Sequence, residues 1–302
     1  MEVQVPAEAA GERLDSFLGA RVGSRAQAQR LLEDGRVSLA GRQVPKRHRV
    51  SAGETIVVDE SSDPVADARA RRDPGPAGDA GFGVAYEDDD LLVVEKPAGV
   101  VAHPSRGHHD GTLSQALAAR GAAGGDPWRA GIVHRLDKDT SGLLVVAKHA
   151  DAHRRLKAAL QARTITREYL VLVDGRPPAR TGTIDAPLGR DRRIRTHIST
   201  DTDDPREART HFELEEALPE STLLRARLET GRTHQIRAHF LAIGHPVCGD
   251  PEYGRAGAYG LERQFLHATR LRFDQPLTGA PIDVLSPLPD DLQAALALAR
   301  LP

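Results

Sequence analysis

A twenty-residue stretch, 61–80, divides this 302-residue chain into two parts. Its sequence, SSDPVADARARRDPGPAGDA, contains almost no large apolar side chain. Such a segment cannot bury enough surface to offset the entropy that it would lose on ordering, so we interpret it as a flexible linker. The sequence therefore predicts a small domain over 1–60 and a larger domain over 81–302. Apolar residues make up 39% of the chain, which is enough for a core of ordinary size.

The first part predicts two helices packed on a small sheet. Apolar residues recur at helical spacing over 14–18. A second helix is expected over 24–35, with Ser24 as its N-cap and Gly35 just past its end. Two short runs, 37–39 and 55–58, are typical of strands.

A basic patch covers much of this first part. The chain as a whole carries a net charge of -2, but residues 21–49 contain eight bases and two acids, a net of +6. A compact basic patch on a nearly neutral protein is an electrostatic signature of phosphate binding, and the alternative is an ordinary solvated surface. The bases are Arg21, Arg25, Arg30, Arg36, Arg42, Lys46, Arg47 and Arg49.

Strand-like runs outnumber helical segments in the second part, and several of them are close in sequence. This pattern favours an α+β fold with a mixed, largely antiparallel central sheet flanked by helices. The glycine-rich segment 121–125 is expected to be a flexible insertion. We predict strands over 91–95, 143–147, 169–173 and 222–228, and helices over 151–162 and 233–243.

Several classes of protein are disfavoured by what the sequence lacks. There is no run of 18 apolar residues to span a membrane, and the N-terminus has no apolar segment of a secretion signal. A single cysteine, Cys248, forms no internal disulfide, which fits a reducing cytoplasm. The histidines of AHPSRGHHDG lack the spaced carboxylates or cysteines of a metal site, so we expect no metal.

The segment GIVHRLDKDTSGLLVVAK (131–148) places a charged loop between two apolar runs. Strands that present a charged loop are a common way to hold an active site, and Ser141-Gly142 is expected to turn the chain into the second strand. On charges alone, an exposed turn with local Arg–Asp pairs is the alternative.

Two other stretches carry candidate functional side chains. In LETGRTHQIRAH (228–239) a strand leads into a helix, and Arg232 at that junction is suited to hold a carboxylate by a bidentate bond. Tyr169 opens a strand, a place where a tyrosine ordinarily serves packing.

Taken together, these segments resemble the RluA-type pseudouridine synthases. The HRLD and TSG of 131–148 are similar to the catalytic motif of that family, and the remaining motifs follow in family order over about 84–295. They are EKPAGVVAHP (95–104), REYLVLV (167–173), LETGRTHQIRAHFLAIGHPVCGDPEYG (228–254), FLHATRLRF (265–273) and LPDDL (288–292).

The first part resembles a different module, the αL-type RNA-binding domain first known from a small-subunit ribosomal protein. The similarity lies in RLDSFL, in SRAQAQRLLEDGRV and in the strand AGETIVV. This resemblance implies that the basic patch grips structured RNA through its shape and backbone.

The resemblance to the synthases implies isomerisation of uridine to pseudouridine within RNA. The glycosidic carbon–nitrogen bond breaks, the base turns, and a carbon–carbon bond forms. Because no electrons are lost and no outside group is transferred, we expect no cofactor and no metal. The sequence agrees, since it contains neither a P-loop nor a GxGxxG fingerprint.

The resemblance also assigns roles to four residues. Asp137 matches the essential aspartate, which acts either by covalent attack or by abstraction of a ribose proton. Arg232 matches the arginine that pairs with this aspartate, and Arg135 matches the arginine that fills the space left by the flipped base. Tyr169 matches the tyrosine that stacks on the uracil and helps remove the proton from its fifth carbon.

The expected partner is structured RNA: 23S ribosomal RNA first, with transfer RNA as the alternative. A non-catalytic RNA-binding factor in ribosome assembly is a second alternative. We expect a monomer in the cytoplasm with no membrane partner. Residues predicted to contact the RNA backbone are Arg135, Arg25, Arg30, Arg36, Lys46, Arg47, Arg192 and Arg193.

Overall fold

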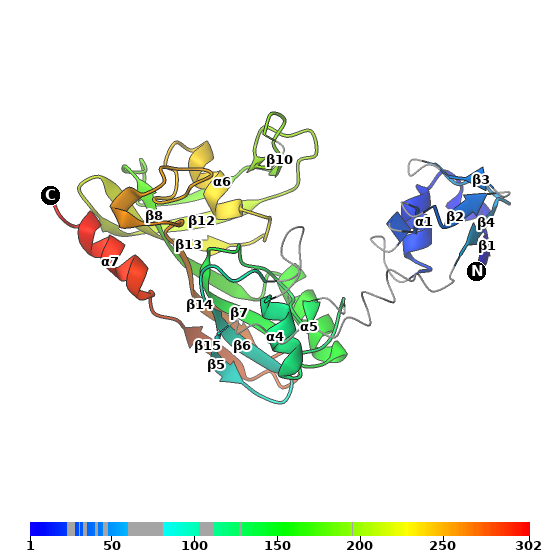
Figure 1. Ribbon diagram of the computed structural model, residues 1–302, viewed down its shortest axis with the longest axis horizontal. Helices are drawn as coiled ribbons and strands as arrows, with labels where there is room; N and C mark the ends of the chain where they lie inside the picture. The colour runs from blue at the N-terminus through cyan, green and yellow to red at the C-terminus, as the bar shows by residue number, and fades with distance from the viewer. Residues whose placement is uncertain are drawn as a thin grey trace. The chain divides into compact units, whose positions relative to one another are not determined.

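The computed structural model divides the chain into two compact units, Met1–Asp73 and Pro74–Pro302, shown in Figure 1. The predicted linker 61–80 falls outside the described residues, so the domain limits at 60 and 81 stay predictions. The structure describes residues 1–22, 28–29, 31–32, 35–39, 42–44, 48–59, 81–102, 111–126, 129–194 and 196–302.

The first unit is built on an antiparallel sheet whose described strands are ordered β1-β4-β2-β3. The predicted strands are confirmed as β2 (Val37–Leu39) and β4 (Thr55–Val58), and the helix at 14–18 as α1 (Leu14–Gly19). Two edge strands, β1 (Glu2–Gln4) and β3 (Arg42–Gln43), were not predicted. Of the predicted RNA-contact residues in this unit, Arg25, Arg30, Lys46 and Arg47 lie outside the described residues, as does Ser24.

A buried carboxylate ties the first unit together. Phe17 and Leu18 of α1 pack with Ile56 of β4 in a core of their own. Asp15, only 1% exposed, accepts hydrogen bonds from Arg13 (Nε, 3.0 Å) and from Gln29 (Nε2, 2.9 Å). A buried carboxylate is tolerated only when it is paired in this way, so the Asp15 cluster fixes α1 on the unit.

The second unit is organised around one large, strongly twisted sheet. Among the described residues the only parallel pairing is between β7 and β14, and every other pair is antiparallel. The prediction of a mixed, largely antiparallel sheet is therefore confirmed. In spatial order the strands are β5 (Gly83–Glu87), β6 (Leu91–Lys96), β7 (Ser141–Ala147), β14 (Leu266–Asp274), β8 (Thr166–Asp174), β13 (Ser221–Leu228), β12 (Arg209–Ala217) and β9 (Thr181–Asp185), with β15 (Pro281–Leu285) paired to β14.

Helices cover parts of this sheet. No helix among the described residues has the length and apolarity to cross a membrane. Figure 1 shows α4 and α5 beside β6 and β7, with α6 over the part of the sheet that contains β12 and β13. The predicted helices at 151–162 and 233–243 are confirmed, although the second begins two residues later. The helices are α4 (Leu113–Ala119), α5 (Ala150–Gln161), α6 (Gln235–Ala242) and α7 (Asp290–Ala299), with short 3-10 turns η1 (Ala7–Ala9) and η3 (Ala258–Gly260) and a small hairpin of β10 (Gly189–Arg190) and β11 (Ile198–Ser199).

One local prediction in this unit is wrong. Ser141 and Gly142 do not form a turn but begin β7, where they pair with His267 and Ala268 of the parallel strand β14. The predicted flexible insertion 121–125 lies beside the end of this strand, since Ala123 donates its N–H to the carbonyl of Ala147 (3.1 Å); its flexibility stays a prediction.

Gly142 explains how β7 and β14 can lie so close together at this point. Its φ of +110° lies in a region that side chains rarely adopt, and a Cβ built on it would lie 2.3 Å from the carbonyl oxygen of Ala268. Only glycine allows β14 to approach β7 so closely. The residue therefore fixes the strand that follows the charged loop.

We expect Gly142→Ala to destabilise the second unit by about 2–4 kcal/mol, because it adds a steric clash to a strained φ. The matched control is Gly279→Ala, where φ is +75° but nothing lies within 4 Å of the added Cβ. There the loss should be roughly 1–2 kcal/mol from φ strain alone. Urea unfolding followed by far-UV circular dichroism measures both, and equal losses would contradict the close-approach argument.

Candidate active site

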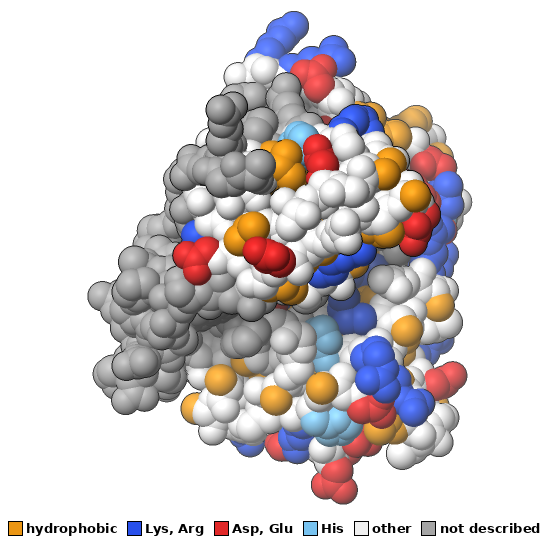
Figure 2. Space-filling model, turned by 90° about the vertical axis from the view of Figure 1, so that its right-hand side faces the viewer, with side chains coloured by type: hydrophobic (Ala, Val, Ile, Leu, Met, Phe, Trp, Pro, Cys, Tyr) orange, Lys and Arg blue, Asp and Glu red, His pale blue; other side chains and the backbone are white. Residues whose placement is uncertain are grey.

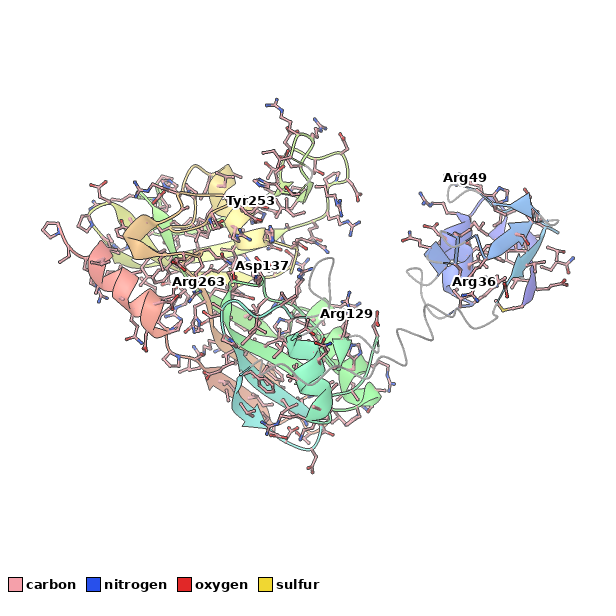
Figure 3. The ribbon with its side chains drawn as sticks, in the orientation of Figure 1. Arg36, Arg49, Arg129, Asp137, Tyr253 and Arg263 are labelled. Atoms are coloured by element: carbon pink, nitrogen blue, oxygen red, sulfur yellow. The ribbon has the colours of Figure 1, made fainter. Side chains whose placement is uncertain are left out.

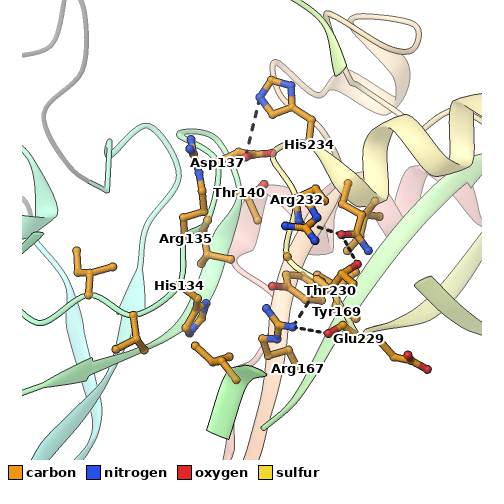
Figure 4. A pocket seen from close by; sticks show the side chains of 18 of the residues that line it. His134, Arg135, Asp137, Thr140, Arg167, Tyr169, Glu229, Thr230, Arg232 and His234 are labelled. Atoms are coloured by element: carbon orange, nitrogen blue, oxygen red, sulfur yellow. Dashed lines mark hydrogen bonds and ion pairs between the residues drawn. The ribbon is translucent and has the colours of Figure 1, made fainter. Parts of the chain in front are cut away.

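A cavity of about 430 Å³ opens beside the charged loop of the second unit. Its walls come from loop 134–140, from the start of β8 and from the segment 228–237 that leads into α6. Four residues predicted to act together, Asp137, Tyr169, Arg135 and Arg232, all line it (Figure 4). The fold thus brings together side chains that are up to 97 positions apart in the sequence.

A buried lysine holds the backbone of the loop that carries Asp137. Lys96, at the end of β6, is 1% exposed, and its Nζ donates to the carbonyls of Pro97 (2.8 Å), Val100 (2.8 Å) and Lys138 (2.7 Å). Burial lowers the pKa of Lys96 to about 7, while the nearby Asp139 and Asp137 oppose that shift. Three acceptors use all three N–H groups of an ammonium, so this geometry favours the charged form.

A second cation holds the same loop from the other side. Arg263 donates to the carbonyl of Asp139 (3.0 Å) and is itself held by both oxygens of Asp291 on α7. Gln264 donates to the hydroxyl of Thr140 (3.0 Å). The backbone around Asp137 is therefore held by side chains from two different segments of the chain, and Figure 3 shows Asp137 near Arg263 in the middle of this unit.

Asp137 points into the cavity with 15% of its side chain exposed. Its Oδ2 lies 3.5 Å from Nη1 of Arg237, and its Oδ1 lies 4.0 Å from Nε2 of His234. The carboxylate therefore faces a fixed cation, and within the described ranges its oxygens accept no short hydrogen bond. A carboxylate in this state can act as a base or as a nucleophile.

The predicted pairing of Asp137 with Arg232 is not what the structure shows. Arg232 is exposed, and its Nε donates to the backbone carbonyl of Glu207 (2.9 Å). Within the described part of the chain it forms no ion pair. The physical reason is that α6 begins at Gln235 rather than at Thr233, so Arg232 lies in the preceding turn at the rim of the cavity.

Arg237 is the residue that the sequence analysis missed. It is 5% exposed, and it donates to both oxygens of the fully buried Asp250 (2.6 and 2.8 Å) and to Glu252 (2.8 Å). Burial acts to lower the pKa of Arg237, but the bonds and charge of Asp250 outweigh it and raise the pKa above its usual value. The signal available in the sequence was the second arginine of GRTHQIRAH, together with the acids of GDPEYG.

The turn before α6 is shaped by His234, whose backbone is left-handed at φ 51°. Its Nδ1 lies 3.0 Å from the hydroxyl of Tyr253, which also accepts the N–H of Ile198 (2.8 Å). Burial lowers the pKa of His234, and the charge of Asp137 works against that shift. His234 thereby forms one wall of the cavity beside the carboxylate.

Tyr169 lies on β8 with its ring against the cavity and is 4% exposed. Burial raises the pKa of Tyr169; the positive charge of Arg167 opposes this, and the negative charge of Asp137 adds to it. The side chain is therefore a neutral phenol at physiological pH. It presents a flat, apolar face on which a base can stack.

The predicted RNA-contact residues that the structure describes differ in how exposed they are and in whether acids pair with them. Arg135 is exposed at the rim of the cavity, but Arg192 is engaged by Asp201 (3.2 Å) and Asp203 (2.8 Å). Arg193 is exposed beside it, and Arg36 of the first unit is half-buried. Figure 2 shows basic side chains interspersed with acidic ones on the face in view.

Comparison with known proteins identifies the family. A family profile described as RNA pseudouridylate synthase matches residues 90–242, which include Asp137, Tyr169 and Arg237. The chain belongs to this family. It is an RNA pseudouridine synthase, an isomerase, as the RluA-type resemblance implied.

Relatives match over nearly the whole chain. The chain is 40% identical to the uncharacterized RNA pseudouridine synthase YlyB of Bacillus subtilis over 97% of this chain and 95% of that protein. It is 41% identical to a protein of Nitrosomonas europaea named ribosomal large subunit pseudouridine synthase D, over 100% and 89% of the two chains. The solved structure of human RNA pseudouridylate synthase domain containing 1 has 29% identity and a TM-score of 0.57, covering 76% of this chain and 98% of that one.

We expect Arg237→Met to cost about 3–5 kcal/mol of stability, because it leaves the buried Asp250 without its partner. The double variant Arg237→Met, Asp250→Leu should recover most of that stability but not the activity, since Asp137 still lacks its cation. Thermal unfolding and pseudouridine formation measure the two effects separately. If Arg232→Met abolished activity while Arg237→Met preserved it, the pairing seen here would not be the functional one.

Proposed function

We propose that this protein converts specific uridines of 23S ribosomal RNA to pseudouridine, with Asp137 as the essential catalytic group. The observation that carries the catalytic part is the Asp137 carboxylate, which faces the cavity beside Arg237 and Tyr169. A carboxylate next to a stacking platform suits attack on the ribose of a flipped nucleotide. Arg135 and Arg232, both at the rim, then contact the RNA around the vacated position.

The choice of 23S ribosomal RNA is supported by the relatives. Proteins named ribosomal large subunit pseudouridine synthase D in Nitrosomonas europaea, Xanthomonas campestris and Pseudomonas aeruginosa match 98–100% of this chain at 39–41% identity. The match thus includes the first unit as well as the catalytic one. We propose that the protein acts as a monomer in the cytoplasm, where ribosomal RNA is assembled.

We propose further that the first unit is an αL-type RNA-binding domain. Arg21 and Arg49 are exposed on it, and its small sheet and helix have a core separate from that of the second unit. Arg192 and Arg193 of the catalytic unit would add backbone contacts, and the structure favours Arg193 because Arg192 is held by two carboxylates. Such contacts position the RNA without reading its sequence.

Asp137→Asn should abolish pseudouridine formation, by about 10³-fold or more, because the amide can act neither as a nucleophile nor as a base. The test is transcriptome-wide mapping of pseudouridine in a deletion strain that carries either the wild-type or the variant gene. Asp151→Asn on α5, a partly exposed acid outside the cavity that pairs with Arg154 and Arg155, is the matched control. Restored sites in transfer RNA alone would overturn the choice of ribosomal RNA, and sites restored by Asp137→Asn would overturn the catalytic assignment.

Deleting residues 1–60 should weaken RNA binding and flatten its salt dependence. The slope of log K against log salt should fall by about 0.7–0.9 for each phosphate that the shortened chain no longer neutralises, because fewer counterions are released on binding. Affinities of the full chain and of the shortened chain for 23S ribosomal RNA, measured over a range of salt concentrations, give the two slopes. An unchanged slope would mean that the first unit does not grip the RNA backbone.

A further inference from the structure

One buried arginine beside the cavity pairs with no acid among the residues that the structure describes. Arg167 lies on β8, is 6% exposed and lines the cavity two residues before Tyr169. Its Nη2 makes only long contacts, 3.4 Å each, to the carbonyls of Glu229 and Thr230, and its Nε is buried without a partner. The buried arginines Arg237 and Arg263, by contrast, are each held by both oxygens of an aspartate.

A second unused donor lies at the same end of the cavity. His134 accepts the N–H of Val145 at its Nε2 (3.1 Å), so the ring proton is on Nδ1, and that atom is buried without a partner. Burial, followed by the charge of Arg167, lowers the pKa of His134 to about 3, so the ring is neutral and keeps this tautomer. A buried polar atom without a hydrogen-bond partner destabilises the folded protein, and a ligand that forms this hydrogen bond removes the destabilisation.

These donors lie at the end of the cavity away from Asp137. In Figure 4, Asp137 and His234 lie at one end and His134 and Arg167 at the other, with Tyr169 between them. A flipped nucleotide enters base first, and its phosphates stay outside in water. A nucleotide with its ribose at Asp137 and its base against Tyr169 would direct the edge of the base towards Arg167 and His134.

We propose that Arg167 and His134 bind the carbonyl oxygens of the flipped uracil, and that Arg167 stabilises the negative charge that the base carries when its glycosidic bond breaks. This proposal rests on the proposed role of Asp137. It makes Arg167 a catalytic residue, because its guanidinium contacts the leaving base. Arg135 and the other exposed cations at the rim are left to contact phosphates.

The charge follows from the balance of the reaction. The C1′–N1 bond breaks, and its electron pair stays on the uracil, spread over N1 and the two carbonyl oxygens. In one route the Asp137 carboxylate bonds to C1′, and in the other it takes the C2′ proton and leaves a C1′=C2′ double bond. C5 then bonds to C1′; in the first route the bond between C1′ and the carboxylate breaks and its electron pair returns to Asp137, and in the second route the proton returns to C2′. In both routes the proton of C5 is lost while N1 gains one. Atoms and electrons balance, and the uracil anion is common to both routes.

The surroundings of Arg167 suit this task. A cation held in a low-dielectric site and aimed at developing charge is worth more than the same cation in water. The turn beside it leaves it room, since a Cβ on Gly231 would lie 2.9 Å from its Nη1. Because no carboxylate in the described structure pairs with Arg167, its positive charge remains available to attract the substrate.

The test compares Arg167→Gln, Arg167→Lys and Arg167→Ala with Arg270→Gln, an arginine of the neighbouring strand that pairs with Asp283 outside the cavity. The substrate is total RNA labelled with [5-³H]uridine from cells that lack the gene, so the target need not be known. Single-turnover release of tritium at increasing enzyme concentration gives both a rate constant and a dissociation constant. Thermal unfolding checks that each variant is folded.

We expect Arg167→Gln to lower the rate constant by about 10²–10³-fold, as loss of one charge-stabilising donor does. Arg167→Lys should retain an intermediate rate, and millimolar guanidinium should partly restore Arg167→Ala but not alter Arg270→Gln. The salt slope of the dissociation constant should not change, because the uracil is neutral when it binds. Rescue by guanidinium is a readout that a merely structural role would not give.

Three outcomes would overturn the proposal. An unchanged rate constant in folded Arg167→Gln would remove Arg167 from the reaction. A salt slope reduced by about 0.7 would make Arg167 a phosphate contact instead. A lower rate constant without guanidinium rescue would make its role structural. Failure of the proposed function is distinct, since it shows as tritium release by Asp137→Asn or as none from the wild-type protein.

Discussion

The site depends on a guanidinium that is fixed before any substrate arrives. Arg237 is buried on α6 and spends its Nε and Nη2 on Asp250 and Glu252, which leaves Nη1 for Asp137. Because the fully buried Asp250 needs this partner to be tolerated at all, the position of Arg237 is set by folding and not by the carboxylate that reacts. Asp137 therefore meets a preorganised cation at 3.5 Å and keeps its oxygens available.

The same logic applies to the loop that carries Asp137. Lys96 and Arg263 are both buried and both donate to backbone carbonyls of that loop, at Lys138 and Asp139. Each is held by its own neighbours, Lys96 by two further carbonyls and Arg263 by Asp291. Side chains from β6 and from the segment just before β14 thus fix the charged loop in place, which explains why motifs far apart in the sequence belong to one site.

The sequence predicted those features that depend on local pattern. The apolar runs at 91–95 and 143–147 became β6 and β7, and the charged loop between the apolar runs of 131–148 does line the cavity. The sequence could not show which of the two arginines, Arg232 or Arg237, faces Asp137. That outcome depends on where α6 begins, and the left-handed backbone of His234 sets the start of this helix. Ser141-Gly142 has turn chemistry, but pairing with a strand 126 residues away decides its conformation. The strand β1 is three residues long and is defined only by its pairing with β4.

Asp137 and Arg167 place side chains of opposite charge at the two ends of the cavity, and this gives the cavity a direction. Asp137 supplies negative charge where the ribose is proposed to lie, and Arg167 supplies positive charge where the base is proposed to lie, with the neutral phenol of Tyr169 between them. Breaking a glycosidic bond moves electrons from the sugar towards the base, so this field favours the movement. Had Arg167 a carboxylate partner like that of Arg237, the two charges would cancel and the field would be lost. The absence of an acid beside Arg167 in the described structure is therefore as much a part of the site as the presence of one beside Arg237.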